Sequence, residues 1–95
     1  MIERHVIFDV LSDKTGAFEE FFVREYRPAM SHMPGFVKVE LLRHLETPTQ
    51  YQMLIRFETL EAAAGWRASP EHQALSPRIK ELYHSSQLHV YQVIA

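Results

Sequence analysis

The chain has 95 residues, which is enough for a single domain over residues 1–95 and leaves no room for a separate cofactor-binding lobe. Its net charge of −2 comes from 10 basic and 12 acidic residues that are scattered and matched along the sequence, so nothing points to a nucleic-acid or anionic-membrane partner. The absence of cysteine excludes disulfides, thiolate metal sites and a cysteine nucleophile.

The first third of the chain predicts a strand followed by an amphipathic helix. Residues 3–11 alternate with apolar side chains on both faces, which is typical of a strand that is covered on both sides. Asp13 or Thr15 is placed to cap the next helix, and large apolar side chains then recur at helical spacing over residues 18–30. Because proline lacks a backbone N–H, Pro28 predicts a kink in this helix, or an end of the helix followed by a short turn that restarts it.

The middle of the chain predicts a β-hairpin. Residues 36–44 alternate, with Val37, Val39 and Leu41 on the apolar face. Residues 51–57 alternate in the same way. Only a short connection joins the two segments, so we expect them to pair as antiparallel strands.

Two consecutive helix starts follow the hairpin. Thr59 is positioned to cap the first of these helices. Ser69, followed by a proline at the first helical position and then an acidic residue, gives a second start signal. Pro77 weakens this second helix, but the pattern after it is helical again as far as Tyr83. Residues 88–94 then predict the last strand.

The resulting order β-α-β-β-α-β is that of an α+β, ferredoxin-like fold with a four-stranded antiparallel sheet and two helices on one face. The other face still carries apolar residues, including Ile7, Leu42 and Leu54, and 46% of the sequence is hydrophobic. Packing this bare face against a second copy would bury it, so we expect a homodimer. Arg56 could face that interface and pair with Glu40, or the pair could be solvated.

The first residues interrupt every apolar run with a charge, so we expect no signal peptide. No stretch approaches the roughly 20 apolar residues of a membrane span, so we expect a soluble, cytoplasmic protein that does not contact the membrane.

Trp66 and His72 are the main candidates for a functional role. Trp66 follows the small residues 62–65 and is either a core ring or a pocket wall that could stack on an aromatic ligand. His72 is either a first-turn histidine on a surface helix or a base with a proton affinity near neutral pH. The helix N-terminus disfavours the imidazolium and should lower the pKa of His72 slightly.

Five further residues are candidates for lining a pocket. His5 and Asp9 share one face of the first strand and could point into the subunit pocket; the other three candidates are Phe22, Tyr26 and Tyr83. The sequence contains neither a histidine pair at helical spacing nor a cluster of acidic residues with histidine, so it does not predict a metal site. The three glycines are too dispersed for a phosphate-binding loop, and there is no nucleophile elbow.

A series of short motifs, read in order, resembles the antibiotic biosynthesis monooxygenase superfamily of dimeric α+β barrels. The motifs are Met33-Pro-Gly-Phe36, Leu41-Leu-Arg43, Tyr51 with Phe57-Glu58, and Glu61-Ala62 followed by Gly65-Trp66-Arg-Ala-Ser69 and His72. The resemblance spans nearly the whole chain, and the Pro-Gly-Phe turn and the Trp-x-x-Ser-x-x-His block are its most specific parts. It implies a small homodimer with a pocket between sheet and helices in each subunit.

Members of this superfamily include cofactor-independent monooxygenases that convert polycyclic phenols to quinones. That branch pairs the helix Trp with an Asn four residues earlier, a Tyr six residues later and an Arg further on. In this chain Trp66 is retained, Ala62 replaces the Asn and His72 stands at the Tyr position. Residues 85–87 near the expected Arg read Ser-Ser-Gln.

Another branch binds and degrades haem, using a first-strand Asn, the helix Trp and an iron-ligating His nine or ten residues after that Trp. In this chain His5 and Val6 occupy the first position, and Leu75 or Ser76 occupies the ligand position. Neither Leu nor Ser is a normal haem ligand, so the sequence disfavours haem chemistry.

The leading hypothesis is therefore cofactor-independent, monooxygenase-like oxidation of a small aromatic or quinol-type substrate. Trp66 would stack on the substrate, His72 would act as the base, and no cofactor or metal is expected. The alternative is a non-enzymatic dimer of the same fold that binds a small molecule. Haem binding is the third hypothesis.

Overall fold

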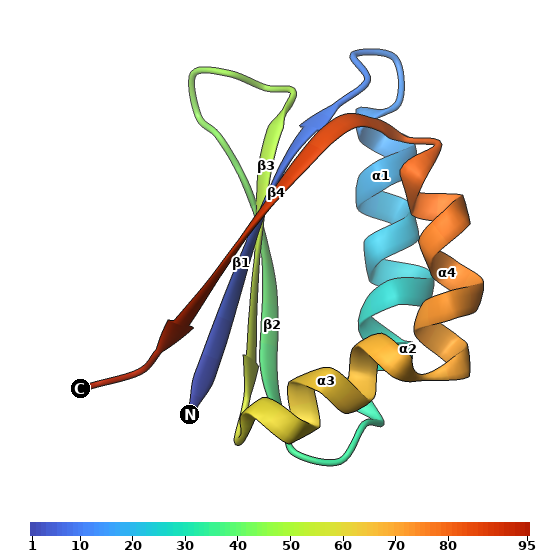
Figure 1. Cartoon of the computed structure of the whole chain (residues 1–95). Coiled ribbons are helices and arrows are strands. Elements are labelled where there is room, and N and C mark those ends of the chain that lie inside the picture. The colour runs from blue at the N-terminus through green and yellow to red at the C-terminus, as the bar shows by residue number, and fades with distance from the viewer.

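The computed structural model describes all residues 1–95 and has the predicted element order (Figure 1). The strands are β1 (Ile2–Val10), β2 (Phe36–Arg43), β3 (Gln50–Phe57) and β4 (Tyr83–Gln92). The helices are α1 (Thr15–Phe21), the π-helical turn η1 (Phe22–Tyr26), α2 (Arg27–Ser31), α3 (Leu60–Ala68) and α4 (Pro70–Lys80). The sheet order is β2-β3-β1-β4 with antiparallel neighbours, and all helices lie on one face of the sheet, which confirms the ferredoxin-like α+β fold.

The strand registers decide which side chains enter the core between sheet and helices. In β3 every second side chain, from Tyr51 to Phe57, is at most 2% exposed. In the neighbouring β1, Phe8 pairs with Tyr51, and both face the helices. The buried core contains Phe8, Val10, Phe18, Phe21, Phe22, Tyr26, Met30, Tyr51, Met53, Ile55, Phe57, Ala63, Trp66, Leu75 and Ile79.

The first helical segment is continuous, because α1, η1 and α2 follow one another without a break (Figure 1). The predicted caps are wrong: Lys14 is the N-cap residue of α1, and no side chain caps the helix there. Pro28 neither ends the segment nor starts a separate turn. The wide π turn lies directly before it, where a regular helix would bring the proline ring against a carbonyl of the preceding turn.

The hairpin of β2 and β3 is confirmed, with one change of register. A bulge between Phe36 and Lys38 places Phe36 opposite Phe57 and leaves Val37 out of the regular pairing. Val37 is therefore 39% exposed, whereas the sequence pattern placed it on the apolar face.

The last strand is longer at its start than predicted. Tyr83 pairs with Val10 at the beginning of β4, rather than ending a helix, and the strand stops at Gln92. Helix α4 runs through Pro77 as far as Lys80.

The second face of the sheet carries no helix (Figure 1). On this open face Glu3 binds Arg56, with Oε2 2.7 Å from Nε, and Glu3 also contacts the ring of His5 at 2.8 Å. The predicted pairing of Arg56 with Glu40 is therefore wrong, since Glu40 contacts Lys38 at 3.5 Å instead.

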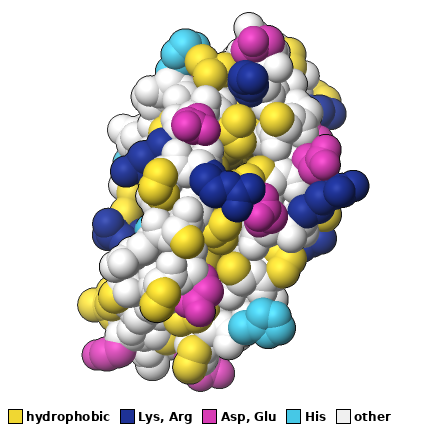
Figure 2. All heavy atoms as spheres, turned by 90° about the vertical axis from the view of Figure 1, so that its right-hand side faces the viewer, with side chains coloured by type: hydrophobic (Ala, Val, Ile, Leu, Met, Phe, Trp, Pro, Cys, Tyr) yellow, Lys and Arg dark blue, Asp and Glu magenta, His cyan; other side chains and the backbone are white.

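Figure 2 shows the outer face of the helical layer, where basic and acidic side chains are interspersed. Arg78 of α4 binds Glu25 of η1 there, with 2.7 Å between Nη1 and Oε1, so this ion pair ties the two helical segments together. None of the helices combines the length and the apolar composition that crossing a bilayer requires.

Candidate functional site

The junction of α3 and α4 fixes the positions of Trp66 and His72. Thr59 caps α3 as predicted and accepts a hydrogen bond from the Ala62 N–H at 3.1 Å. Ser69 lies between the two helices and is 5% exposed. Its hydroxyl donates to the Trp66 carbonyl at 2.7 Å and accepts from the His72 N–H at 3.1 Å. One hydroxyl therefore links the backbones of both candidate residues, which explains their spacing on either side of Ser69.

The rings of Trp66, His72 and Tyr26 form one cluster. The centroid of Trp66 lies 5.1 Å from that of His72 with an interplanar angle of 84°, and 5.5 Å from that of Tyr26 at 89°. Tyr26 and His72 are 6.4 Å apart. These edge-to-face contacts hold each ring in a defined orientation. Trp66 is 1% exposed, so it is a core ring as well as a wall of the space beside it.

A cavity of about 250 Å³ lies against this ring cluster, between the helices and strands β1 and β4. Its aromatic and aliphatic walls include Phe8, Ile55 and Leu88 beside the three clustered rings. The polar groups that line it are Arg4, Arg67, Ser76, Lys80, Tyr83 and Ser86, in addition to His72, Tyr26 and Trp66.

The surroundings of the cavity shift the acid–base properties of its two titratable rings. Burial lowers the pKa of His72, and the positive charges of Arg67, Arg4 and Lys80 lower it further. Burial raises the pKa of Tyr26, and the Arg4 charge opposes this shift. At neutral pH the cavity thus holds an unprotonated imidazole that can accept a proton and a phenol that can donate a hydrogen bond.

The structure brings some of the predicted pocket residues to this cluster and not others. Tyr26 and Tyr83 line the cavity with Trp66 and His72. His5 and Asp9 lie on the opposite face of the sheet, since they alternate with the β1 residues that face the helices.

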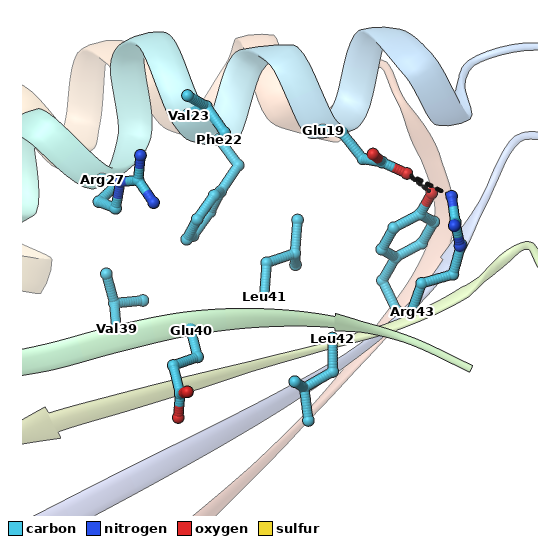
Figure 3. A pocket seen from close by; sticks show the side chains of 10 residues that line it. Glu19, Phe22, Val23, Arg27, Val39, Glu40, Leu41, Leu42 and Arg43 are labelled. Carbon is cyan, nitrogen blue, oxygen red and sulfur yellow. Dashed lines mark hydrogen bonds and ion pairs between the residues drawn. The ribbon is translucent and has the colours of Figure 1, made fainter. Parts of the chain in front are cut away.

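Phe22 lines a different cavity of about 490 Å³, between η1 and the edge strand β2 (Figure 3). The Glu19 carboxylate there accepts hydrogen bonds from the Tyr51 hydroxyl and from Arg43, the latter at 2.9 Å. Because these polar groups already bind one another, this larger cavity has fewer groups available to bind a ligand than the smaller cavity beside Trp66.

The small residue at position 62 has a packing role. Gly35 adopts a positive φ of 78°, and a Cβ placed on it would lie 2.6 Å from the Cβ of Ala62. Helix α3 therefore approaches the turn before β2 closely, and Ala62 does not line the cavity. At the other positions discussed for the resemblance, Ser76 and Ser86 line the cavity, whereas Leu75 is 8% exposed in the core.

The motifs of the sequence did not point to the basic residues of the cavity. Arg4, Arg67 and Lys80 all line it, and no Asp or Glu does. The signal that the sequence offered for Arg4 is that it shares a strand face with Val6, Phe8 and Val10, which is the face that the structure turns toward the helices. No group of three or more His, Asp or Glu side chains lies close enough together to hold a metal ion.

Comparison with known proteins links this arrangement to one family. The model of the family described as antibiotic biosynthesis monooxygenase matches residues 1–78. The sequence matches no curated protein closely enough to count as a relative.

Three solved structures illustrate the similarity of fold. SnoaB from Streptomyces nogalater, described as a cofactor-independent oxygenase, superposes with a TM-score of 0.89 at 20% identity, over 99% of this chain and 93% of that one. Proteins provisionally assigned as antibiotic biosynthesis monooxygenases from Nitrosomonas europaea and Bordetella bronchiseptica give TM-scores of 0.88 and 0.87 at 20% and 23% identity. The first covers 100% of both chains, and the second 99% of this chain and 97% of its own.

Proposed function

The chain belongs to the antibiotic biosynthesis monooxygenase family, and from this premise we propose that it catalyses a cofactor-independent oxidation of a small aromatic or quinol-type molecule by O₂. The observation that carries the proposal is the position of His72, whose ring is held edge-on to the buried Trp66 at the wall of a cavity of about 250 Å³. Burial lowers the pKa of this ring, which favours its neutral form at neutral pH. Such a cavity supplies a base, an aromatic surface and partial exclusion of water.

The proposed reaction begins with transfer of the phenol O–H proton to His72. The resulting phenolate is electron-rich, and a ring carbon that bears hydrogen gives two electrons to O₂ as a C–O bond forms. The proton on His72 then returns to the outer peroxide oxygen. Loss of the ring C–H proton breaks the O–O bond, releases water and leaves a second C=O on the ring. One phenol and one O₂ thus give one quinone and one water, with the substrate as the only reductant.

The rings of Trp66 and Tyr26 would bind and orient the substrate for this oxidation. Trp66 offers a ring wall against which the substrate packs, and aromatic contacts of this kind contribute about 0.5–1.5 kcal/mol beyond area burial. Tyr26 would remain protonated because burial raises its pKa, so its hydroxyl can donate to an oxygen of the substrate.

Oxygen uptake with a panel of naphthols and hydroquinones tests the proposal. We expect turnover above the uncatalysed background, and His72→Ala should lower kcat about 10²- to 10⁴-fold, the usual contribution of a general base. His32→Ala is the matched control, because His32 is exposed at the end of α2 and away from the cavity. Absence of turnover across the panel would reject the oxidation, and a full rate in His72→Ala would reject the role of the base.

A second candidate function is binding without turnover. Ala62 packs against the Gly35 turn and places no polar group in the cavity, which favours this alternative. A ligand of the panel that binds in calorimetry while oxygen uptake stays at background would support binding as the function.

We also propose that the protein works as a homodimer that is joined through the open face of the sheet. The support is that Ile7, Leu42 and Leu54 lie on this face, which no helix covers. Face-to-face packing would remove these side chains from water and leave both Trp66 cavities on the outside of the joined sheets.

A further inference from the structure

Arg4 is the most unusual side chain of the Trp66 cavity. It lies in the central strand β1, points to the helical layer and is only 8% exposed. No ion pair or side-chain hydrogen bond reaches its guanidinium. No fully buried side-chain nitrogen in the structure lacks a partner, so the nitrogens of Arg4 are not sealed in protein but open to the cavity. A buried arginine without a counter-ion is rare, because burying a charge is costly unless it is paired.

No acidic residue is placed to neutralise Arg4, because none lines the cavity. Glu3, its neighbour in sequence, binds Arg56 and His5 on the opposite face of the sheet. Glu25 binds Arg78 on the outer helical surface. A second copy on the open face would not supply the missing charge either, since that face lies on the other side of β1 from the Arg4 side chain.

Two further cations surround the same space. Arg67, at the end of α3, and Lys80, at the end of α4, line the cavity and have no ion-pair partner. Burial lowers the pKa of Arg4, and the nearby Arg67 charge lowers it further. The cavity therefore combines aromatic walls with a positive potential and contains no acid.

We propose that Arg4 anchors a carboxylate-binding subsite in the Trp66 cavity, and that the ligand is an aromatic acid whose ring lies against Trp66 while its carboxylate binds the guanidinium. A planar guanidinium fork matches a planar carboxylate in a bidentate pair. Arg67 and Lys80, which are exposed at the rim, attract the anion into the cavity.

This inference deepens the proposed function, on which it rests, because it names the substrate class of the same cavity. An aromatic acid with a ring hydroxyl presents a carboxylate to Arg4 and a phenol to His72. Binding of an aromatic acid can be measured without turnover, so the two proposals can fail separately.

The test is isothermal titration calorimetry under nitrogen with 2-naphthoate as the charged probe and 2-naphthalenemethanol as the neutral probe of similar shape. We expect Arg4→Gln to weaken naphthoate binding at least about 10-fold, the usual loss for a hydrogen bond to a charged group. The unmodified protein should bind the neutral alcohol more weakly than naphthoate. The affinity for the alcohol should not change between the unmodified protein and Arg4→Gln. Arg27→Gln is the matched control, since Arg27 has no ion pair and lies outside this cavity.

Equal affinity of the unmodified protein for the two probes, or an unchanged naphthoate affinity in Arg4→Gln, would overturn the proposal, as would no binding of naphthoate. Displacement of naphthoate by an equal concentration of inorganic phosphate would overturn the assignment of a carboxylate. Circular dichroism checks that Arg4→Gln is folded. If it is not, Arg4→Lys is the deciding variant, because lysine keeps the positive charge but lacks the planar guanidinium. Arg4→Lys should then bind naphthoate more weakly than the unmodified protein.

Oxygen uptake with 4-hydroxy-1-naphthoate separates the two proposals. Naphthoate binding that depends on Arg4 without oxygen uptake would leave the carboxylate subsite standing and reject the oxidation. Oxygen uptake with neutral naphthols, together with a naphthoate affinity that does not change in Arg4→Gln, would leave the oxidation standing and reject the subsite.

Discussion

The protonation state of His72 is set by its neighbours. Its backbone is fixed by Ser69, and its ring contacts Trp66 and Tyr26, so the imidazole is partly removed from water. Arg4 and the other cavity cations repel a proton on this ring. Both effects favour the neutral form, which is the form that a general base requires.

We predict that the His72 ring titrates with a midpoint below the ordinary value of 6.5. Two-dimensional NMR of the ring carbons across the pH range measures it, and His72→Gln identifies the resonance by its loss. Because the unfolded chain takes up the proton first, this residue should make stability fall as pH drops from 6.5 through the folded-state pKa, and make no contribution above that window. The acid-side slope should be shallower in His72→Gln; a midpoint at or above 6.5 would contradict the prediction.

At the scale of residues, the sequence pointed to Trp66 and His72 as candidates because both belong to a motif with a defined spacing. It was less informative about Arg4, because a single arginine in an alternating strand has no motif, and only the absence of an acid around it in three dimensions makes it conspicuous. His5 and Asp9 share a strand face, as expected, but the sequence could not say on which side of the sheet the helices pack.

At the scale of elements, the close approach of α3 to the turn before β2 positions the wall of the site. Gly35 permits this approach through its positive φ and its lack of a Cβ, and Ala62 is the residue it meets. Since Trp66 lies one turn further along α3, a shift of the helix at Ala62 would move the indole ring and the cavity with it.

We predict that Gly35→Ala destabilises the protein by at least about 2 kcal/mol, because it combines an unfavourable φ with a 2.6 Å contact to Ala62. Gly65→Ala is the matched control, because no neighbouring atom lies within 4 Å of the added methyl group. Alanine favours a helical position more than glycine does, so this variant should raise the free energy of unfolding by about 0.5–1 kcal/mol. Urea unfolding of both variants gives the comparison. Equal stability of the two variants would show that α3 does not need this close contact.

The boundaries of elements show where local sequence rules fail. The caps at Thr59 and Ser69 were predictable because each depends on residues within one turn. Three other features were not predictable, because each depends on packing or pairing with a distant segment. They are the π turn before Pro28, the bulge at Val37 and the early start of β4.

At the scale of the whole molecule, the sheet separates two surfaces of different chemistry. The helical side encloses the basic, ring-lined cavity. The open side presents apolar side chains beside a network in which Glu3 binds Arg56 and His5, and His5 contacts Gln52 at 3.2 Å. In a face-to-face dimer this network would be desolvated with its charges already paired, so it would oppose association less than isolated charges would.

Ile7 provides the sharpest test of that dimer. It lies in the central strand of the open face, between Gln52 and Gln87 of the neighbouring strands. In a monomer, Ile7→Glu would place its carboxylate in water beside two amides, so the fold should tolerate it. In a face-to-face dimer, the symmetry of the interface would bury two unpaired carboxylates, which is strongly unfavourable.

We therefore predict that size-exclusion chromatography with light scattering gives a dimer for the unmodified chain at micromolar concentration and a monomer for Ile7→Glu. Leu60→Glu is the control, because Leu60 is 60% exposed at the start of α3, where an added acid is compatible with the helix dipole. It should remain a dimer. A monomeric unmodified chain would reject the proposed assembly outright, and a folded Ile7→Glu variant that stays dimeric would move the interface to another surface of the molecule.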